Sequence, residues 1–377
     1  MILELHLLQS FPVSNLNRDD VGQPKTATFG GVTRGRISSQ SLKRAARNLF
    51  AQHGLDEHET AVRTKRLRAE AAAVLAERGR DLDEARGVAI AGLEKLGFGV
   101  DQTTGLTEYL LFVGHDAITY LAGYCDEHWD ELLAIAAAKE GTKKPPKVKP
   151  DKDALTHARR LLDASRAADV ALFGRMIADN KDFSVTAASQ VAHALSTHAV
   201  ATEFDFYTAV DDLKPEAESG ADMIGTVDFN AACYYRYANL DLDQLERNLG
   251  GDHDLAARAA KAWLNAFIHA VPSGKQNSMA ALTKPEVLLG VVRDGDAWNL
   301  ANAFLKPVSD ADVMTASAHR LAAHFTQLRG FYGDDGIRAA IAASVTSEPL
   351  TIEGAETAAN LGEFTAGLLA ATEPAAV

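Results

Sequence analysis

The sequence predicts an α+β protein in which a sheet-forming domain is interrupted by a long helical insertion. Several segments alternate like strands or are rich in aromatic and β-branched residues, namely 2–9, part of 192–207, 234–240 and 286–292. Residues 55–140 are instead rich in Ala, Leu, Glu and Arg at helical spacing, as are 252–270 and 311–328. Because strands occur on both sides of a long helical block, we expect a sheet domain with an insertion.

Composition excludes several classes of protein. Of the 377 residues, 47% are hydrophobic, which is enough for substantial cores. No run reaches the roughly 18 uncharged apolar residues of a membrane span. The N-terminus lacks a basic region ahead of an apolar run, so no signal peptide is expected. Two cysteines, Cys125 and Cys233, are too few for a disulfide framework. We therefore expect a cytoplasmic protein without membrane contact.

Charge is distributed unevenly along the chain. The net charge of −13 argues against a protein that coats nucleic acid over its whole surface. Residues 18–47, however, contain seven basic and two acidic side chains, a local net charge of +5, whereas the other 347 residues carry −18. This segregation indicates that the segment faces a polyanion or a partner's acidic surface. A solvated basic face is the alternative.

The end of this segment reads as an amphipathic helix. Ser38 or Ser39 is a suitable N-cap. The apolar positions at helical spacing are Leu42, Ala45, Ala46, Leu49 and Phe50. The opposite side carries an amide and three cations, here called the basic ridge: Gln40, Lys43, Arg44 and Arg47. Such groups suit phosphate oxygens, so the basic ridge predicts salt-dependent binding of nucleic acid without sequence preference.

The stretch before this helix, TFGGVTRGRISS, is rich in glycine. Its glycines would let the backbone bend closely around a ligand. Arg34 and Arg36 stand two residues apart, so on a strand their side chains would point to one side. The sequence leaves two interpretations open: the arginines bind a ligand, or the stretch is a hairpin with exposed arginines.

Irregular segments are expected at three places. Residues 143–152 carry three prolines among mutually repelling lysines, which predicts a non-helical basic loop, either solvated or in loose contact with nucleic acid. Residues 214–225 read as a protruding loop that carries Met223 and Ile224. The tail after Thr372 is expected to fray.

No catalytic motif is complete. Ser273-Gly274-Lys275-Gln276 resembles the end of a phosphate-binding loop, but Gln276 replaces the required Ser or Thr and His269 replaces the earlier glycine. The paired carboxylates Asp19-Asp20 and Asp211-Asp212 are of the type used by metal-assisted nucleases, yet no second half-site accompanies them. We therefore expect no enzyme, no metal site and no cofactor.

Five motifs carry a family resemblance in a constant order. They are Asn15 to Asp20 (NLNRDD), the Phe29-Gly30-Gly31 turn, Arg36 to Ala45 (RISSQSLKRA), Phe206 to Asp212 (FYTAVDD) and Tyr235 to Asn239 (YRYAN). Together they resemble the CasC family, the repeated backbone subunit of the type I-E CRISPR surveillance complex, Cascade. The resemblance extends to about Phe304 and is weakest in 52–165 and after 305.

The resemblance implies a subunit shaped like a right hand. An RRM-like (ferredoxin-like) palm would comprise residues 1–55 and 180–377. A large helical finger insertion would comprise residues 56–179. A protruding thumb loop would lie at 203–230, within the palm.

The resemblance and the basic segment together predict the RNA-binding residues. The segment contributes Arg18, Lys25, Arg34, Arg36, Ser39, Gln40, Lys43, Arg44 and Arg47. Met176, in Gly174-Arg175-Met176, matches a methionine that wedges beside displaced bases, and Ile224 matches an apolar thumb residue that is usually leucine. Phe206, Tyr207 and Thr208 match a thumb-base segment near RNA, where the first aromatic is commonly Trp. Without the resemblance, Met176 and Ile224 would be assigned to the core.

The implied function is non-catalytic. The subunit would polymerise head to tail along CRISPR guide RNA and present it for pairing with target DNA in antiviral defence. Other Cascade subunits and a separately recruited helicase-nuclease would be further partners. Two alternatives stay open. One is an endoribonuclease of a CRISPR-type ribonucleoprotein; the other is a general single-stranded nucleic-acid-coating protein, which would normally stack bases on a regular aromatic series.

Overall fold

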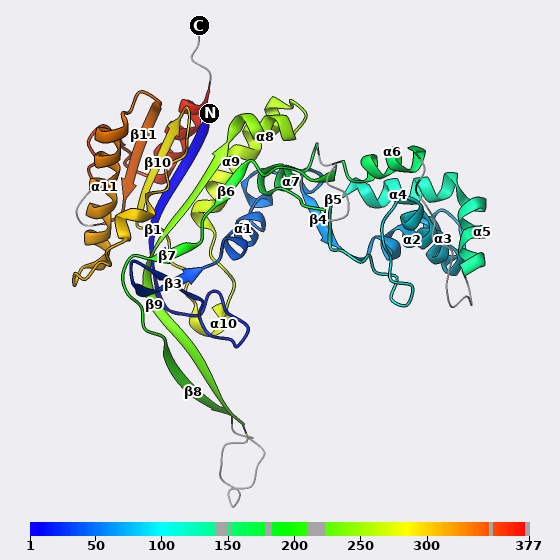
Figure 1. Cartoon of the computed structure of the whole chain (residues 1–377), viewed down its shortest axis with the longest axis horizontal. Helices are drawn as coiled ribbons and strands as arrows, with labels where there is room; N and C mark the ends of the chain where they lie inside the picture. The colour runs from blue at the N-terminus through cyan, green and yellow to red at the C-terminus, as the bar shows by residue number, and fades with distance from the viewer. Residues whose placement is uncertain are drawn as a thin grey trace, which may run out of the picture. The chain divides into compact units, whose positions relative to one another are not determined.

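The computed structural model describes residues 1–139, 150, 152–163, 165–177, 183–209, 223–346 and 350–373. The chain divides into two compact units. The first unit comprises residues 1–53, 189–243 and 260–377, and the second comprises 54–188 and 244–259. The mixed α+β class predicted from the sequence is confirmed (Figure 1). No helix in the described part is long and apolar enough to cross a membrane.

The first unit is built on one large sheet. In spatial order its main strands are β12 (Glu356–Thr357), β11 (Ile337–Ser344), β10 (Val287–Arg293), β1 (Ile2–Ser14), β9 (Met223–Asp241), β7 (Ala194–Ser196), β3 (Val32–Ile37) and β2 (Thr26–Phe29). Two further strands, β6 (Ser189–Val191) and β8 (Glu203–Ala209), also pair with β9. The described pairings are antiparallel apart from β11 with β12. All four strands expected from the sequence are present.

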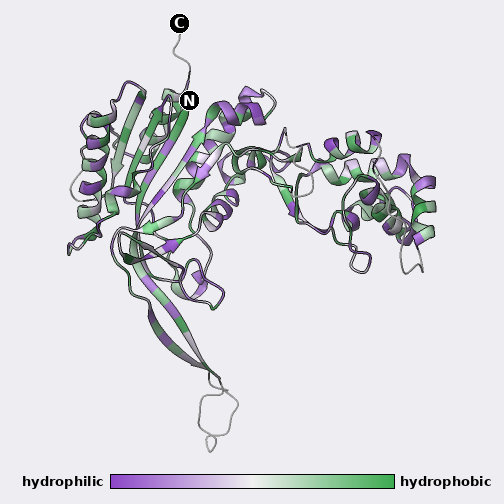
Figure 2. Ribbon diagram, in the orientation of Figure 1, coloured by the Kyte–Doolittle hydropathy of each residue, from purple (hydrophilic) through white to green (hydrophobic). Residues whose placement is uncertain are grey.

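Helices cover both faces of this sheet. On the face of Leu5, the side chain of Leu368 in α12 (Leu361–Thr372) packs over Gly290, which is paired with Leu5. On the other face, Leu8 belongs to a cluster with Leu321 of α11 (Val313–Tyr332) and with η5 (Leu300–Phe304). Figure 2 shows the central strands as mostly hydrophobic. Strand β1 is therefore buried on both faces, whereas its alternation predicted a half-buried strand.

The polar residues of β1 are buried in a hydrogen-bonded layer. Glu4 Oε1 accepts hydrogen bonds from the Tyr237 hydroxyl at 2.7 Å and the Trp298 N–H at 2.6 Å. His6 Nδ1 lies 2.9 Å from the Tyr235 hydroxyl. Burial raises the pKa of Glu4 and lowers the pKa of His6 to about 3. The alternation of charged and apolar residues thus marks a polar layer within the core.

A two-stranded ribbon extends from the sheet in Figure 1. It consists of β8, whose seven residues are all exposed, and the first part of β9. Ile224 lies in β9 opposite Thr208, and not in the loop in which the sequence placed it. Strand pairing that begins at Met223 explains the difference. Residues 210–222, including Asp211-Asp212, lie outside the described residues.

The second unit is mainly helical. Its helices include α2 (Leu67–Glu77), α3 (Leu82–Lys95), α4 (Asp116–Glu127), α5 (Trp129–Lys139), α6 (Lys152–Leu161) and α7 (Ala168–Phe173). They enclose a core that includes Leu75, Val88 and Leu121. The predicted helical block also contains a two-stranded antiparallel sheet of β4 (Ala61–Thr64) and β5 (Leu111–Gly114), which the helical composition concealed. Of the predicted basic loop, residues 143–149 and 151 lie outside the described residues.

Residues 244–259 belong to the second unit, although the sequence assigned them to the palm. Helices α8 (Leu242–Asn248) and α9 (His253–His269) both span this boundary. Asn248 Nδ2 donates to the carbonyls of Ala171 and Thr186, at 2.9 and 2.8 Å. Arg258 donates to both carboxylate oxygens of Glu59, at 2.7 and 2.5 Å. These contacts join segments that are distant in sequence, so no local sequence pattern predicts them.

Candidate nucleic-acid interface

The basic ridge lies on helix α1 (Ser39–Arg47), as the sequence predicted. Ser38 is the N-cap, and its hydroxyl accepts a hydrogen bond from the Ser41 N–H at 3.3 Å. Leu42 and Ala46 are buried on the inner side. On the outer side, Gln40 and Arg44 are exposed, and Lys43 and Arg47 are partly buried. The helix thus presents the basic ridge outward because its apolar stripe packs inward.

The motif NLNRDD forms a loop that docks on the start of α1. Asn17 Oδ1 accepts a hydrogen bond from the Ser38 N–H at 2.8 Å. Asn15 is buried and donates to the carbonyls of Gly22 and Asp228. Asp19 Oδ1 accepts from two backbone N–H groups of its own loop. These contacts hold the loop beside the helix.

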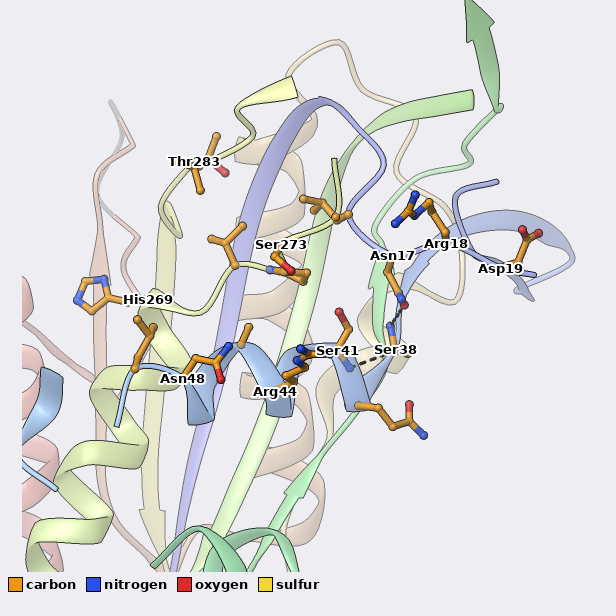
Figure 3. Close-up of a pocket in the computed structure, with 18 of the residues that line it drawn as sticks. Asn17, Arg18, Asp19, Ser38, Ser41, Arg44, Asn48, His269, Ser273 and Thr283 are labelled. Atoms are coloured by element: carbon orange, nitrogen blue, oxygen red, sulfur yellow. Dashed lines mark hydrogen bonds between the residues drawn. The ribbon is translucent and has the colours of Figure 1, made fainter. Parts of the chain in front are cut away.

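A cavity of about 1070 Å³ opens between α1 and this loop. Arg18, Gln40 and Arg44, all predicted site residues, line it, together with Asn48 and Lys284. Figure 3 shows Arg18, Arg44 and Ser273 bordering it from three separate segments. We call it the basic cavity. Asp19 and Asp20 also border it, but Asp19 Oδ1 already accepts hydrogen bonds from backbone N–H groups of its own loop. The cavity offers cationic and amide donors to an anionic ligand.

A second group of predicted residues surrounds His193. Arg36 Nη1 lies 3.2 Å from His193 Nδ1, and the Ser39 N–H donates to the same atom at 3.4 Å. Burial lowers the pKa of His193, and the positive charges of Arg36 and Lys25 lower it further. Lys25, Arg36 and Ser39 therefore lie together at the N-terminal end of α1, where the field is positive.

Arg34 does not belong to this surface, which contradicts its prediction as an RNA contact. Its side chain is fully buried. The guanidinium donates to the carbonyls of Phe29 at 3.2 Å, Ser196 at 3.0 Å, Phe304 at 2.8 Å and Leu305 at 3.4 Å. Arg34 lies two positions before the partly buried Arg36, but its side chain points inward, where it donates to buried carbonyls of three segments.

Phe206 and Tyr207 line a second cavity of about 440 Å³ at the base of the ribbon. Phe229, Lys275 and Met279 also border it, and we call it the aromatic cavity. The Phe206 side chain is 67% exposed, so a planar ligand can reach its ring. Thr208 and Ile224 lie farther along the ribbon, where Ile224 is 69% exposed.

Met176 lies in the second unit and is 86% exposed. The preceding residue, Arg175, is buried and donates to the carbonyls of Phe112, Leu162 and Phe183. This anchored arginine fixes the backbone on which the methionine is presented. The interpretation of Met176 and Ile224 as core residues is therefore wrong, and their exposure agrees with the family resemblance.

Sequence reasoning missed several residues of these cavities. The basic cavity is also bordered by His269, Ser273, Gly274, Thr283 and Lys284. The Ser-Gly-Lys stretch was the available signal, but it failed as a nucleotide-binding motif. Among the described residues, no group of three or more His, Cys, Asp or Glu side chains could hold a metal ion.

Comparisons with known proteins find one matching family model and similar solved structures. The family model described as CT1975-like protein matches residues 3–366. A solved chain from a "CRISPR RNA-guided surveillance complex, pre-nicking" is 35% identical, with a TM-score of 0.86, and the match covers 99% of this chain and 100% of that one. A chain from a "CRISPR RNA-guided surveillance complex" is 30% identical, with a TM-score of 0.75 and the same coverage. No curated protein matches the sequence.

Proposed function

The chain belongs to the CT1975-like protein family, and from that premise we propose that it is the guide-RNA-binding backbone subunit of a CRISPR surveillance complex of the Cascade type. The two solved chains that it matches over almost its whole length come from CRISPR RNA-guided surveillance complexes. The subunit holds the guide RNA, and base pairing between the guide and target DNA supplies sequence recognition.

The basic cavity is the observation that carries this proposal. Arg18, Gln40 and Arg44 converge there from two segments that are held together by the contact of Asn17 with Ser38. Cations and amides recognise phosphate oxygens irrespective of the bases attached to them. One subunit can therefore bind at any register of any guide.

The parts of the proposed right hand correspond to elements of the two units. The strand order β10-β1-β9-β7, with α1 after β1 and α9 between β9 and β10, supports an RRM-like palm. The finger insertion is the second unit, and the β8–β9 ribbon is the thumb. In this scheme Met176 and Ile224 wedge against displaced bases, which their exposure supports.

Assembly follows from the same proposal. Copies associate head to tail along one guide, in a type I-E complex with other Cascade subunits, and a helicase-nuclease is recruited separately to the assembled complex. The subunit itself is non-catalytic. A cytoplasmic location is supported by the two cysteines, both of which are free thiols.

The first experiment identifies the RNA. We purify the chain with its partners from its host. We expect it to carry short RNAs whose ends derive from a common repeat and whose central sequences differ. RNAs of unrelated sequence would instead indicate a general coating protein. Complementary RNA added with magnesium should remain intact, because cleavage would favour the endoribonuclease.

The second experiment tests the basic ridge in the full chain. Changing Lys43, Arg44 and Arg47 together to Ala should reduce the slope of log K against log salt by about 2, because each lost phosphate contact on a single strand removes about 0.7. The control is Lys261→Ala, an exposed lysine on α9 that borders neither cavity. An unchanged slope in a folded triple variant would remove the basic ridge from the interface.

A further inference from the structure

Residues 271–284, here called the 271–284 loop although they include the short helix α10 (Gln276–Met279), border both cavities of the first unit. Ser273, Gly274 and Lys284 line the basic cavity, and Lys275 and Met279 line the aromatic cavity. In contrast, the lining residues from α1 belong to the basic cavity, and those from β8 belong to the aromatic cavity. The loop is therefore the segment that connects the two.

From this position we propose that the 271–284 loop forms a second wall of the RNA track, and that Lys275 and Lys284 are further phosphate-binding residues. The inference rests on the proposed function and adds to it. A single RNA strand would pass from the basic ridge across the loop to the aromatic rings at the base of the ribbon. Lys284 would hold a phosphate in the basic cavity, and Lys275 a phosphate beside the base that stacks in the aromatic cavity.

The loop is fixed at one end by a close backbone approach. A Cβ atom on Gly274 would lie 2.4 Å from the carbonyl oxygen of Leu16 and 2.6 Å from that of Asn15. Only glycine permits this approach, so the loop lies directly on the segment that carries Arg18. The contact places Lys275 and Arg18 on two segments that cannot move independently of each other.

Hydrogen bonds fix the other end of the loop. Thr283 Oγ1 donates to the carbonyl of Ser10 at 2.7 Å, and Gln9 Nε2 donates to the carbonyl of Thr283 at 2.8 Å. Both partners belong to the central strand β1. Within the loop, Gln276 Nε2 donates to the carbonyl of Pro272 at 2.9 Å. The loop is therefore held in position before any ligand arrives, which lowers the entropic cost of binding.

Lys275 occupies an unfavourable backbone conformation. Its φ is +52°, in the left-handed region where glycine or asparagine is favoured over a long side chain. A lysine in this conformation points to a role for its side chain, since strained residues gather at functional sites. In the aromatic cavity it stands with Phe206 and Tyr207, whose rings suit base stacking. A stacked base brings its own phosphate, and Lys275 supplies the cation for it.

Lys284 is held by a neighbouring imidazole. Its Nζ lies 3.3 Å from His269 Nδ1. Burial lowers the pKa of His269, and the charge of Lys284 lowers it further, so the imidazole stays neutral and accepts from the ammonium group. This contact uses one proton of the ammonium group and leaves the others for a phosphate oxygen.

The test measures RNA binding by the full chain as a function of salt. Lys275→Ala and Lys284→Ala should each reduce the slope of log K against log salt by about 0.7, and the double variant by about 1.4. Lys261→Ala should leave the slope unchanged. If the variant of the basic ridge lowers the slope and the double loop variant does not, the loop inference fails while the proposed function stands. If neither lowers it, the proposed function fails as well.

A glycine variant separates a binding role from a structural one. Lys275→Gly removes the cation but suits the left-handed backbone, so the melting temperature should stay the same or rise while the salt slope falls by about 0.7. A variant that melts at a higher temperature and binds RNA with the original slope would overturn the assignment of Lys275.

Discussion

A substitution of Arg34 distinguishes most clearly between an arginine that stabilises the fold and one that binds RNA. We consider Arg34→Met, which keeps much of the side-chain volume and removes the guanidinium. Three of its four hydrogen bonds are 3.2 Å or shorter. Because a hydrogen bond to a charged group contributes about 1.5 kcal/mol or more, the loss of these three bonds should lower the free energy of unfolding by about 4.5 kcal/mol or more. In a unit of this size, that loss lowers the melting temperature by about 10 °C.

The assay combines thermal unfolding with RNA binding at several salt concentrations, well below the melting temperature of the variant. Arg34→Met should melt early and bind RNA with an unchanged salt slope, because the buried guanidinium contacts no phosphate. Arg44→Ala is the matched control, since Arg44 is exposed in the basic cavity. It should melt normally and lose about 0.7 from the slope. An Arg34 variant of normal stability with a reduced slope would refute the structural role.

Two further predictions concern other parts of the chain. Burial holds the pKa of His6 at about 3, whereas the unfolded chain protonates this residue near pH 6.5, so stability falls as the pH drops from 7 towards 3. The loss through His6 between pH 7 and pH 5 should be about 2 kcal/mol, and His6→Gln should remove that part in denaturant titrations at the two pH values. Met176→Ala and Ile224→Ala should leave the melting temperature unchanged, because both side chains are exposed. If these residues wedge between bases, the variants should reduce the chemical reactivity of displaced guide bases in the assembled complex; unchanged reactivity would argue against the wedge.

Local patterns were sufficient for the helix that carries the basic ridge. The 3.6-residue period places Leu42 and Ala46 on one side and Gln40 and Arg44 on the other, whatever the rest of the chain does. Local patterns also predicted the strands at 2–9, 234–240 and 286–292. The exposure of Met176 and Ile224 was expected only through the family resemblance, because an isolated apolar side chain carries no local sign of being outside the core.

The amino-acid sequence by itself therefore determined the class of fold, the orientation of α1 and the position of the basic segment, since each depends on residues close together in the chain. The tertiary structure alone decided which residues reach the site. It turned Arg34 inward to meet carbonyls of Ser196 and Phe304, and it brought Gly274 against Leu16 so that Lys284 borders the basic cavity. Hydrogen-bond partners and close approaches between distant segments produce no periodicity, so only the folded chain reveals them.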